Sequence, residues 1–166
     1  HWHFAVIGAY SSTALTEMQI QARELGMESR VHVLPWTPYD VVRRWVPGCD
    51  VGVALYASEA PNLNWRVMGS ARVKLMEYMA ASLPSIVCSR DTFAALANAT
   101  GALEVLESET DASITRALDR LQPGTEHGAR LSRAASAAHL ARYHCEAQLA
   151  PLLHSLGLDR GPARER

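Results

Sequence analysis

Residues 70–89, SARVKLMEYMAASLPSIVCS, constrain the fold more than any other part of the chain. Apolar residues recur there at helical spacing over about a dozen residues, which predicts a helix with a broad inward face. That face comprises Val73, Leu75, Met76, Met79 and Ala80. Leu83-Pro84 should end the helix, because proline disfavours helical geometry in the residue before it. Residues 85–88, SIVC, then have the length and β-branched content of a buried strand of a parallel sheet.

The two cations of this helix lie at its N-terminal end, where positive charge stabilises a helix least. Arg72 and Lys74 fall in or near the first turn, where the helix dipole already places about half a positive charge. An anion at that end would relieve the repulsion, and helix N-termini commonly bind phosphate. Ser70, Lys74 and Glu77 share one stripe of the helix and are candidate ligand contacts. The alternative is a simple Lys74–Glu77 ion pair, whose order along the helix is the less favourable one.

Composition excludes several classes of protein. The 166 residues suffice for one domain with a hydrophobic core, and 48% hydrophobic with 20% charged residues is ordinary for a globular protein. A net charge of −1 and a pI near 6.7 argue against nucleic acid as a partner. No apolar run approaches the roughly 20 residues of a transmembrane helix, and the N-terminus lacks the features of a signal peptide. We therefore expect a cytoplasmic protein.

Cysteine and histidine spacing predicts neither disulfides nor a metal site. Cys49, Cys88 and Cys145 are widely separated and odd in number, which favours reduced thiols. The nearest approaches to a metal-binding pattern are His1 with His3 and His139 with His144, and neither resembles a ligand set. We expect no metal and no cofactor.

Short apolar runs alternate with helical segments along the rest of the chain. Strands are expected at residues 4–8, 31–34, 51–55, 85–88 and 102–106. Helices are expected at residues 13–25, at a short segment capped by Thr37 with Pro38 in its first turn, at 91–97, 110–121, 126–143 and 146–156. This order predicts an α/β fold with a parallel sheet of about five strands and helices on both faces. We expect one domain over residues 1–157 and a disordered polar tail over 158–166.

In such sheets ligands bind outside the carboxyl ends of the strands. That rule brings together the loops at residues 8–12, 35–38 and 56–70 with the start of the central helix. The third loop is long enough to favour a functional role. The loop after the first strand has a single glycine, Gly8, and matches neither a dinucleotide-binding nor a P-loop pattern.

The run from Asp50 to Cys88 resembles the C-terminal domain of GT-B glycosyltransferases. Lys74-Leu75-Met76-Glu77-Tyr78-Met79-Ala80, followed by Leu83-Pro84, is similar to that family's K-x-x-E-Y-x-A pattern before a hydrophobic strand. The resemblance extends over residues 4–121 and implies a Rossmann-like domain that binds a nucleotide-sugar donor, most closely a UDP-sugar as in bacterial exopolysaccharide glucuronosyltransferases. It implies a transferase, acting in polysaccharide biosynthesis, whose acceptor is a saccharide or lipid-linked, with peripheral association at the inner membrane face.

The resemblance also implies roles for single residues. Glu77 matches the residue that holds the ribose hydroxyls, Lys74 a basic donor-site residue, and Val73 an apolar contact to the base. Tyr56 matches an aromatic position of the same pocket, and Gly8 the loop that approaches the pyrophosphate or the acceptor. Glu59 lies close to the sequence position at which many relatives keep an acid facing the donor sugar. Its separation from Glu77 in the sequence is longer than in those relatives. Trp36 is a candidate for stacking on the base, or a packing residue.

Several departures from the family pattern are visible. Ser82 stands where relatives usually have glycine before Leu-Pro, and Pro35-Trp36 where they often carry glycine and a polar residue. The family's leading βα unit, and the N-terminal domain that holds the catalytic base and the acceptor site, have no counterpart here. The resemblance therefore implies a donor-binding domain with no catalytic residue of its own, inactive by itself.

Two other functions remain open on the sequence. A non-catalytic regulatory or interaction module could share the α/β fold, although a response-regulator receiver would need clustered acids after its first strand and an aspartate ending its third. Those strands end in Gly8 and Tyr56. A GT-B epimerase would share the donor site and need catalytic acids that the sequence does not identify.

Overall fold

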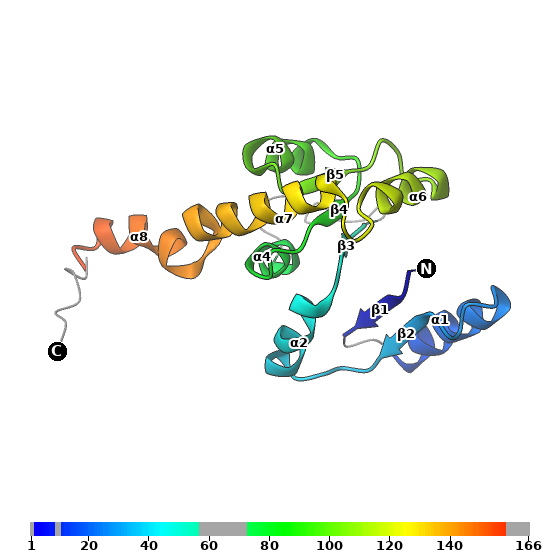
Figure 1. Cartoon of the computed structure of the whole chain (residues 1–166). Helices are drawn as coiled ribbons and strands as arrows, with labels where there is room; N and C mark the ends of the chain where they lie inside the picture. Colours follow the sequence, from blue (N-terminus) through cyan, green and yellow to red (C-terminus); the bar gives the residue numbers. More distant parts are fainter. Residues whose placement is uncertain (1, 9–10, 57–72, 159–166) are drawn as a thin grey trace. The chain divides into compact units, whose positions relative to one another are not determined.

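The computed structural model describes residues 2–8, 11–56 and 73–158 (Figure 1). The chain forms two compact units, residues 1–46 and 47–166, and each is described by itself. A 3₁₀ turn, η1 (Val46–Gly48), lies where one unit passes into the next.

The first unit is a parallel strand pair with two helices. Its strands pair in register, with Phe4 opposite Val31 and Ile7 opposite Leu34. The first helix is capped by Ser11, whose hydroxyl accepts the N–H of Ala14 at 3.2 Å, and is followed by Gly26 with a φ of 63°. The elements are β1 (Phe4–Ile7), α1 (Ser12–Glu24), β2 (Val31–Leu34) and α2 (Tyr39–Trp45).

The start of α2 differs from the sequence-based expectation. Thr37 does not cap this helix, because its hydroxyl donates instead to the carbonyl of Pro35 at 3.0 Å. Pro38 has an extended ψ of 138° and occupies the cap position, so the helix begins one residue later than expected. Its proline is therefore outside the first turn rather than in it.

The second unit is built on a three-stranded parallel sheet in the order β3-β4-β5. In the part of the chain that the structure describes, the five strands expected from the sequence are present and pair in parallel, in one sheet of two strands and one of three. The elements are β3 (Gly52–Ala54), α4 (Val73–Ala80), β4 (Ser85–Val87), α5 (Asp91–Thr100), β5 (Leu103–Val105), α6 (Asp111–Arg120), α7 (Glu126–Ala138), η2 (His139–Tyr143) and α8 (Cys145–Ser155).

Helices cover both faces of this sheet. Neighbouring residues of β4 point to opposite faces, so Val87 and Ile86 belong to separate buried clusters. Val87 packs with side chains of α4, α5 and α7, and Ile86 with side chains of α6 and α7. The prediction of a parallel α/β sheet covered on both faces is thereby confirmed.

Helix α4 buries a narrower face than its apolar sequence predicted. Leu75 and Met79 are fully buried, one turn apart, whereas Val73 is 70% exposed and Ala80 is also exposed. The expectation that Val73 and Ala80 pack inward was wrong. They lie off the Leu75–Met79 stripe, and the helix has apolar residues around most of its circumference, so periodicity did not single out one face.

Tyr78 fastens this helix to the sheet. Its hydroxyl donates to the carbonyl of Val53 at 3.3 Å, and its ring lies directly over Gly52. A Cβ at position 52 would come within 2.5 Å of the ring, so only glycine allows this approach. The tyrosine of the K-x-x-E-Y pattern is therefore a packing residue here.

Helix α4 ends before Leu83-Pro84, in a Schellman turn. The N–H of Ser82 donates to the carbonyl of Met79 and the N–H of Leu83 to that of Tyr78. Ser82 takes a φ of 57°, in the left-handed region that glycine adopts without strain. Ser82 stands where the family pattern has glycine. Its backbone nevertheless adopts the left-handed conformation that glycine favours.

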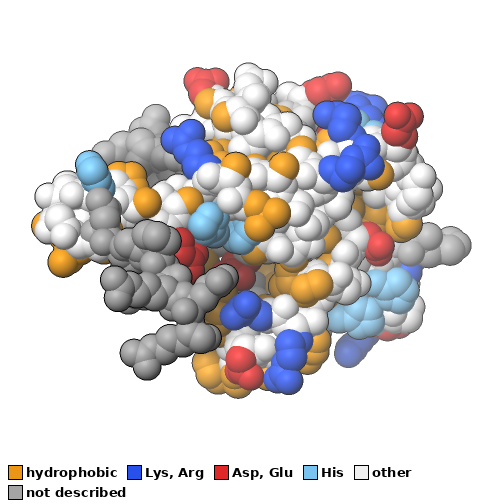
Figure 2. Space-filling view, turned by 60° about the vertical axis from the view of Figure 1, so that its left-hand side comes forward, with side chains coloured by type: hydrophobic (Ala, Val, Ile, Leu, Met, Phe, Trp, Pro, Cys, Tyr) orange, Lys and Arg blue, Asp and Glu red, His pale blue; other side chains and the backbone are white. Residues whose placement is uncertain are grey.

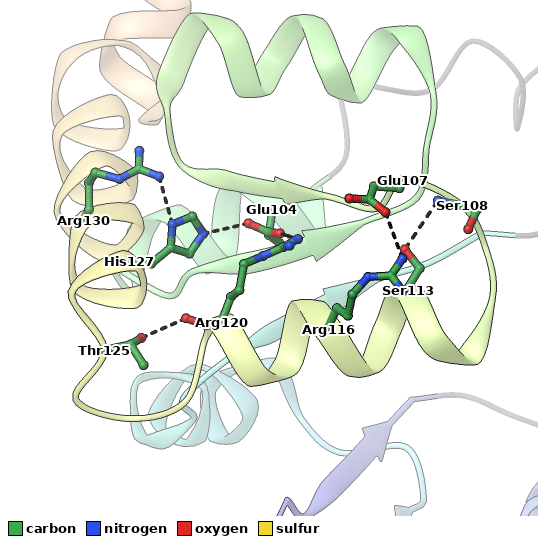
Figure 3. A network of polar contacts seen from close by, with 9 residues as sticks. All are labelled: Glu104, Glu107, Ser108, Ser113, Arg116, Arg120, Thr125, His127 and Arg130. Carbon is green, nitrogen blue, oxygen red and sulfur yellow. Dashed lines mark hydrogen bonds and ion pairs between the residues drawn. The ribbon is translucent and has the colours of Figure 1, made fainter.

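A buried carboxylate joins β5 to α6 and α7 (Figure 3). Glu104 accepts hydrogen bonds from Arg120 and from Nε2 of His127, the latter at 2.8 Å. Arg130 donates to Nδ1 of the same imidazole at 3.1 Å. Only 9% of the Glu104 side chain is exposed, so its charge depends on these partners.

The helical stretch expected over residues 126–143 is divided in the structure. The α-helical geometry of α7 gives way to a π-helical turn, η2, before α8 begins. At the start of α8, Nδ1 of His144 lies 2.9 Å from a carboxylate oxygen of Glu146, and this hydrogen bond lowers the pKa of that carboxyl. Among residues 2–8, 11–56 and 73–158, no helix has the length and apolarity needed to span a bilayer.

Replacing Ser82 by glycine should stabilise the protein. The change removes the cost of a left-handed backbone in a residue with a Cβ, and the greater entropy of glycine in the unfolded chain offsets part of the gain. We expect the free energy of unfolding to rise by about 0.5–1 kcal/mol, measured by urea denaturation. Ser82→Ala is the matched control and should give no increase; a gain with alanine would show that the hydroxyl, not the backbone, is the source of strain.

Arg120 and Arg116 lie one turn apart on α6 and test the buried carboxylate. Arg120→Ala should cost about 1–3 kcal/mol of stability, because Glu104 is buried and keeps only His127 as a partner. Arg116 pairs with Glu107 at 2.8 Å where both side chains are more than half exposed, so Arg116→Ala should cost at most about 0.5 kcal/mol. Equal losses in urea denaturation would contradict this account.

Candidate functional site

The candidate site lies at the carboxyl edge of the three-stranded sheet. Tyr56 follows β3 by two residues, and Cys88 and Arg90 follow β4. Lys74 comes to the same edge from the first turn of α4, because a helix between two parallel strands runs back across the sheet. This is the edge at which ligands bind in parallel α/β folds.

Tyr56 is held at this edge by its backbone and by its ring. Its N–H donates to Sγ of Cys88 at 3.3 Å, and its carbonyl accepts a hydrogen bond from Arg90 at 2.9 Å. Its ring stacks on buried Phe93 of α5, with 6.1 Å between centroids and 15° between planes. These contacts fix both the chain and the side chain where β3 ends.

Lys74 brings a positive charge to the Tyr56 ring. Its Nζ lies 5.6 Å from the ring centroid, within the range of a cation–π interaction. Lys74 is the only lysine in the chain, the other 15 of its 16 basic residues being arginine. Glu77 follows one turn later on α4 and is half-buried. A cation and a carboxylate therefore stand one turn apart at a ligand-binding edge.

A small pocket adjoins Tyr56 in the same unit. It has a volume of about 230 Å³ and is lined by Leu55, Tyr56, Leu106, Glu109 and Ile114. The walls come from the ends of β3 and β5 and from α6, and they are mostly apolar, with Glu109 as the charged member. Within the described part of the chain, no group of three or more His, Cys, Asp or Glu side chains could hold a metal ion.

The structure brings some of the predicted residues together. Tyr56, Val73, Lys74 and Glu77 belong to the second unit, where Lys74 contacts Tyr56 and Val73 stands exposed beside it on α4. Gly8 and Trp36 belong to the first unit, where they follow β1 and β2 at the carboxyl edge of the strand pair, and Trp36 is 66% exposed. Ser70 and Glu59 lie outside the described residues.

Arg90 and Cys88 are the contacts that sequence reasoning missed. Both act on the backbone of Tyr56, from 34 and 32 residues away. The carboxyl-edge rule applied to the fourth strand, as it was to the first three, would have pointed to Arg90. The three cysteines are free, and Cys88 is the buried one.

The fold and this edge define an α/β, Rossmann-like domain with parallel sheets and a polar helix start at the ligand-binding edge. A family model, glycosyl transferases group 1, matches residues 1–122, and the chain belongs to that family. No curated protein matches the sequence.

A solved structure supports the fold. The crystal structure of WaaG, described as a glycosyltransferase involved in lipopolysaccharide biosynthesis, superposes with a TM-score of 0.65 at 14% sequence identity. The match covers 96% of this chain and 38% of WaaG, so the chain spans well under half of that protein's length. The expected GT-B C-terminal-domain fold is confirmed.

The Arg90 contact can be tested by amide hydrogen exchange. Arg90→Met keeps an apolar stem and removes the guanidinium that holds the Tyr56 carbonyl. Losing a hydrogen bond to a charged group, about 1.5 kcal/mol, should speed exchange of the Tyr56 amide about tenfold. Arg116→Met, which removes an exposed arginine of the same unit, should leave that amide unchanged. Unchanged exchange in Arg90→Met would show that Arg90 does not anchor Tyr56.

Proposed function

We propose that this chain is the donor-binding domain of a glycosyltransferase and that its donor is a UDP-sugar. The observation that carries the proposal is the placement of Lys74 and Glu77 one turn apart on α4, at the carboxyl edge of the sheet. A diphosphate needs a cation, and a ribose offers hydroxyl donors that a carboxylate accepts. Membership of the glycosyl transferases group 1 family supports the same function.

Each candidate site residue of the second unit then has a role in binding the donor. The Lys74 ammonium neutralises the diphosphate, and the Glu77 carboxylate accepts hydrogen bonds from the ribose hydroxyls. Val73, exposed on the same helix, contacts the base. Tyr56 belongs to the same pocket, and Ser70 would add a polar contact at the phosphate end.

The first unit and the long loop have more general roles in the proposal. Gly8 lets the backbone approach the pyrophosphate or the acceptor, and Trp36, which is exposed, is available to stack on the base. Glu59, which lies outside the described residues, is proposed as a contact to the donor sugar. These residues bind and orient the donor, and none of them is assigned as a catalytic base.

The complete enzyme would need a second domain. The chain corresponds to 38% of WaaG, which leaves room for an N-terminal domain that supplies the catalytic base and binds the acceptor. We propose a saccharide or lipid-linked acceptor, in line with the lipopolysaccharide role described for WaaG. Such an acceptor would place the complete enzyme in the cytoplasm, at the inner face of a membrane, whereas this chain alone would transfer no sugar.

Titration of the chain with UDP, GDP, ADP and inorganic pyrophosphate, followed by NMR, tests the donor-binding function. We expect UDP to bind with a Kd on the order of 0.1–1 mM, about 4–5.5 kcal/mol, because a partial site lacks the contacts of the second domain. GDP and ADP should bind more weakly. Absence of binding by every nucleotide, or sugar transfer by the chain alone, would contradict the proposal.

Glu77→Gln should weaken the binding of UDP and of uridine alike, because both contain the ribose. The substitution keeps the shape and one acceptor oxygen but loses the charge, so we expect about tenfold weaker binding, or ~1.4 kcal/mol. Glu126→Gln, which neutralises an exposed acid in the first turn of α7, is the control and should bind like the parent. Unchanged affinity in Glu77→Gln would show that Glu77 does not contribute to nucleotide binding.

A further inference from the structure

The aromatic ring at the site is engaged by the protein itself. Phe93 stacks on the Tyr56 ring with nearly parallel planes, and Nζ of Lys74 lies 5.6 Å from its centroid. The backbone of Tyr56 is fixed as well, by Cys88 at its N–H and by Arg90 at its carbonyl. Phe93 and Lys74 thus both contact the Tyr56 ring from within the protein.

We propose that Tyr56 is a positioning residue: its ring holds the Lys74 ammonium at the carboxyl edge of the sheet and acts on the donor only through that charge. The inference rests on the proposed function and changes the role of Tyr56 within it, from a ligand contact to a support for one. It also accounts for the anchoring of Tyr56, because a ring can orient a cation only if it is itself fixed.

The choice of residue at position 74 supports this role. The chain uses arginine at its other 15 basic positions and lysine only here. An ammonium is a compact charge on a flexible four-carbon stem, so it needs an external contact to fix its place. An aromatic ring provides such a contact through the attraction between its face and a cation, and it carries no charge of its own. Tyr56 therefore holds the Lys74 ammonium in place.

The single lysine makes the contact directly observable. Reductive methylation with ¹³C-formaldehyde labels Lys74 and the N-terminal amine alone. In the parent and in Tyr56→Phe, which keeps the ring, the dimethyl-lysine signal should be shifted by the ring current. In Tyr56→Leu, that shift should disappear. A signal at the same position in parent and Tyr56→Leu would overturn the proposal, whether or not any nucleotide binds.

Binding measurements then test how the contact acts. Tyr56→Leu should weaken UDP binding about two- to fivefold, the range of an exposed cation–π contact, and leave uridine binding unchanged, because uridine lacks the diphosphate. Tyr56→Phe should bind UDP like the parent. Lys74→Met should weaken UDP binding at least as much, and Tyr56→Leu should add nothing to it in the double variant.

The outcomes separate the positioning role from the donor-binding function. Equal losses of UDP and uridine in Tyr56→Leu would make Tyr56 a base or ribose contact and overturn the role alone. Additive losses in the double variant would do the same. A parent chain that binds no UDP would overturn the donor-binding function and the role together. Melting temperatures of all variants are compared, and Tyr56→Met replaces Tyr56→Leu if the latter does not fold.

Discussion

The close packing of Tyr78 on Gly52 is the contact on which the candidate site depends. It sets the distance and rotation of α4 against β3, and Leu75 and Met79 complete the attachment from the same helix. Because a helix is stiff over one turn, the position of Tyr78 also fixes Lys74 and Glu77, which precede it by four residues and one residue. A single glycine in a strand thus determines where a cation and a carboxylate stand at the edge of the sheet.

Much of this arrangement could be predicted from the sequence because its signals are local. Strands show as short apolar runs, and caps such as Ser11 and Thr110 mark where helices begin. The sequence did not predict correctly which face of α4 is buried. Its eight described residues are apolar except Lys74 and Glu77, so several faces satisfy the pattern, and only the fit of Tyr78 over Gly52 selects one.

The candidate site, too, was predictable from the sequence only in part. Lys74 and Glu77 were identifiable because both belong to one short motif with a fixed spacing. The anchoring of Tyr56 was not, because Arg90 and Cys88 bind its backbone, and a carbonyl or an N–H is present at almost every position. The carboxyl-edge rule could have pointed to Arg90 as a residue, but not to its contact with a distant carbonyl, because such contacts leave no residue pattern in the sequence.

The buried Glu104 has a consequence for the outer strand of this sheet. In the described three-stranded sheet, β5 is an outer strand, and outer strands can pair with strands of other chains and so promote aggregation. Glu104 keeps its charge compensated only while Arg120 of α6 and His127 of α7 are in place. Both partners come from helices that cover the sheet, so movement of α6 or α7 away from β5 would take one partner from this buried carboxylate. The ion cluster therefore favours the state in which both helices stay packed on the outer strand.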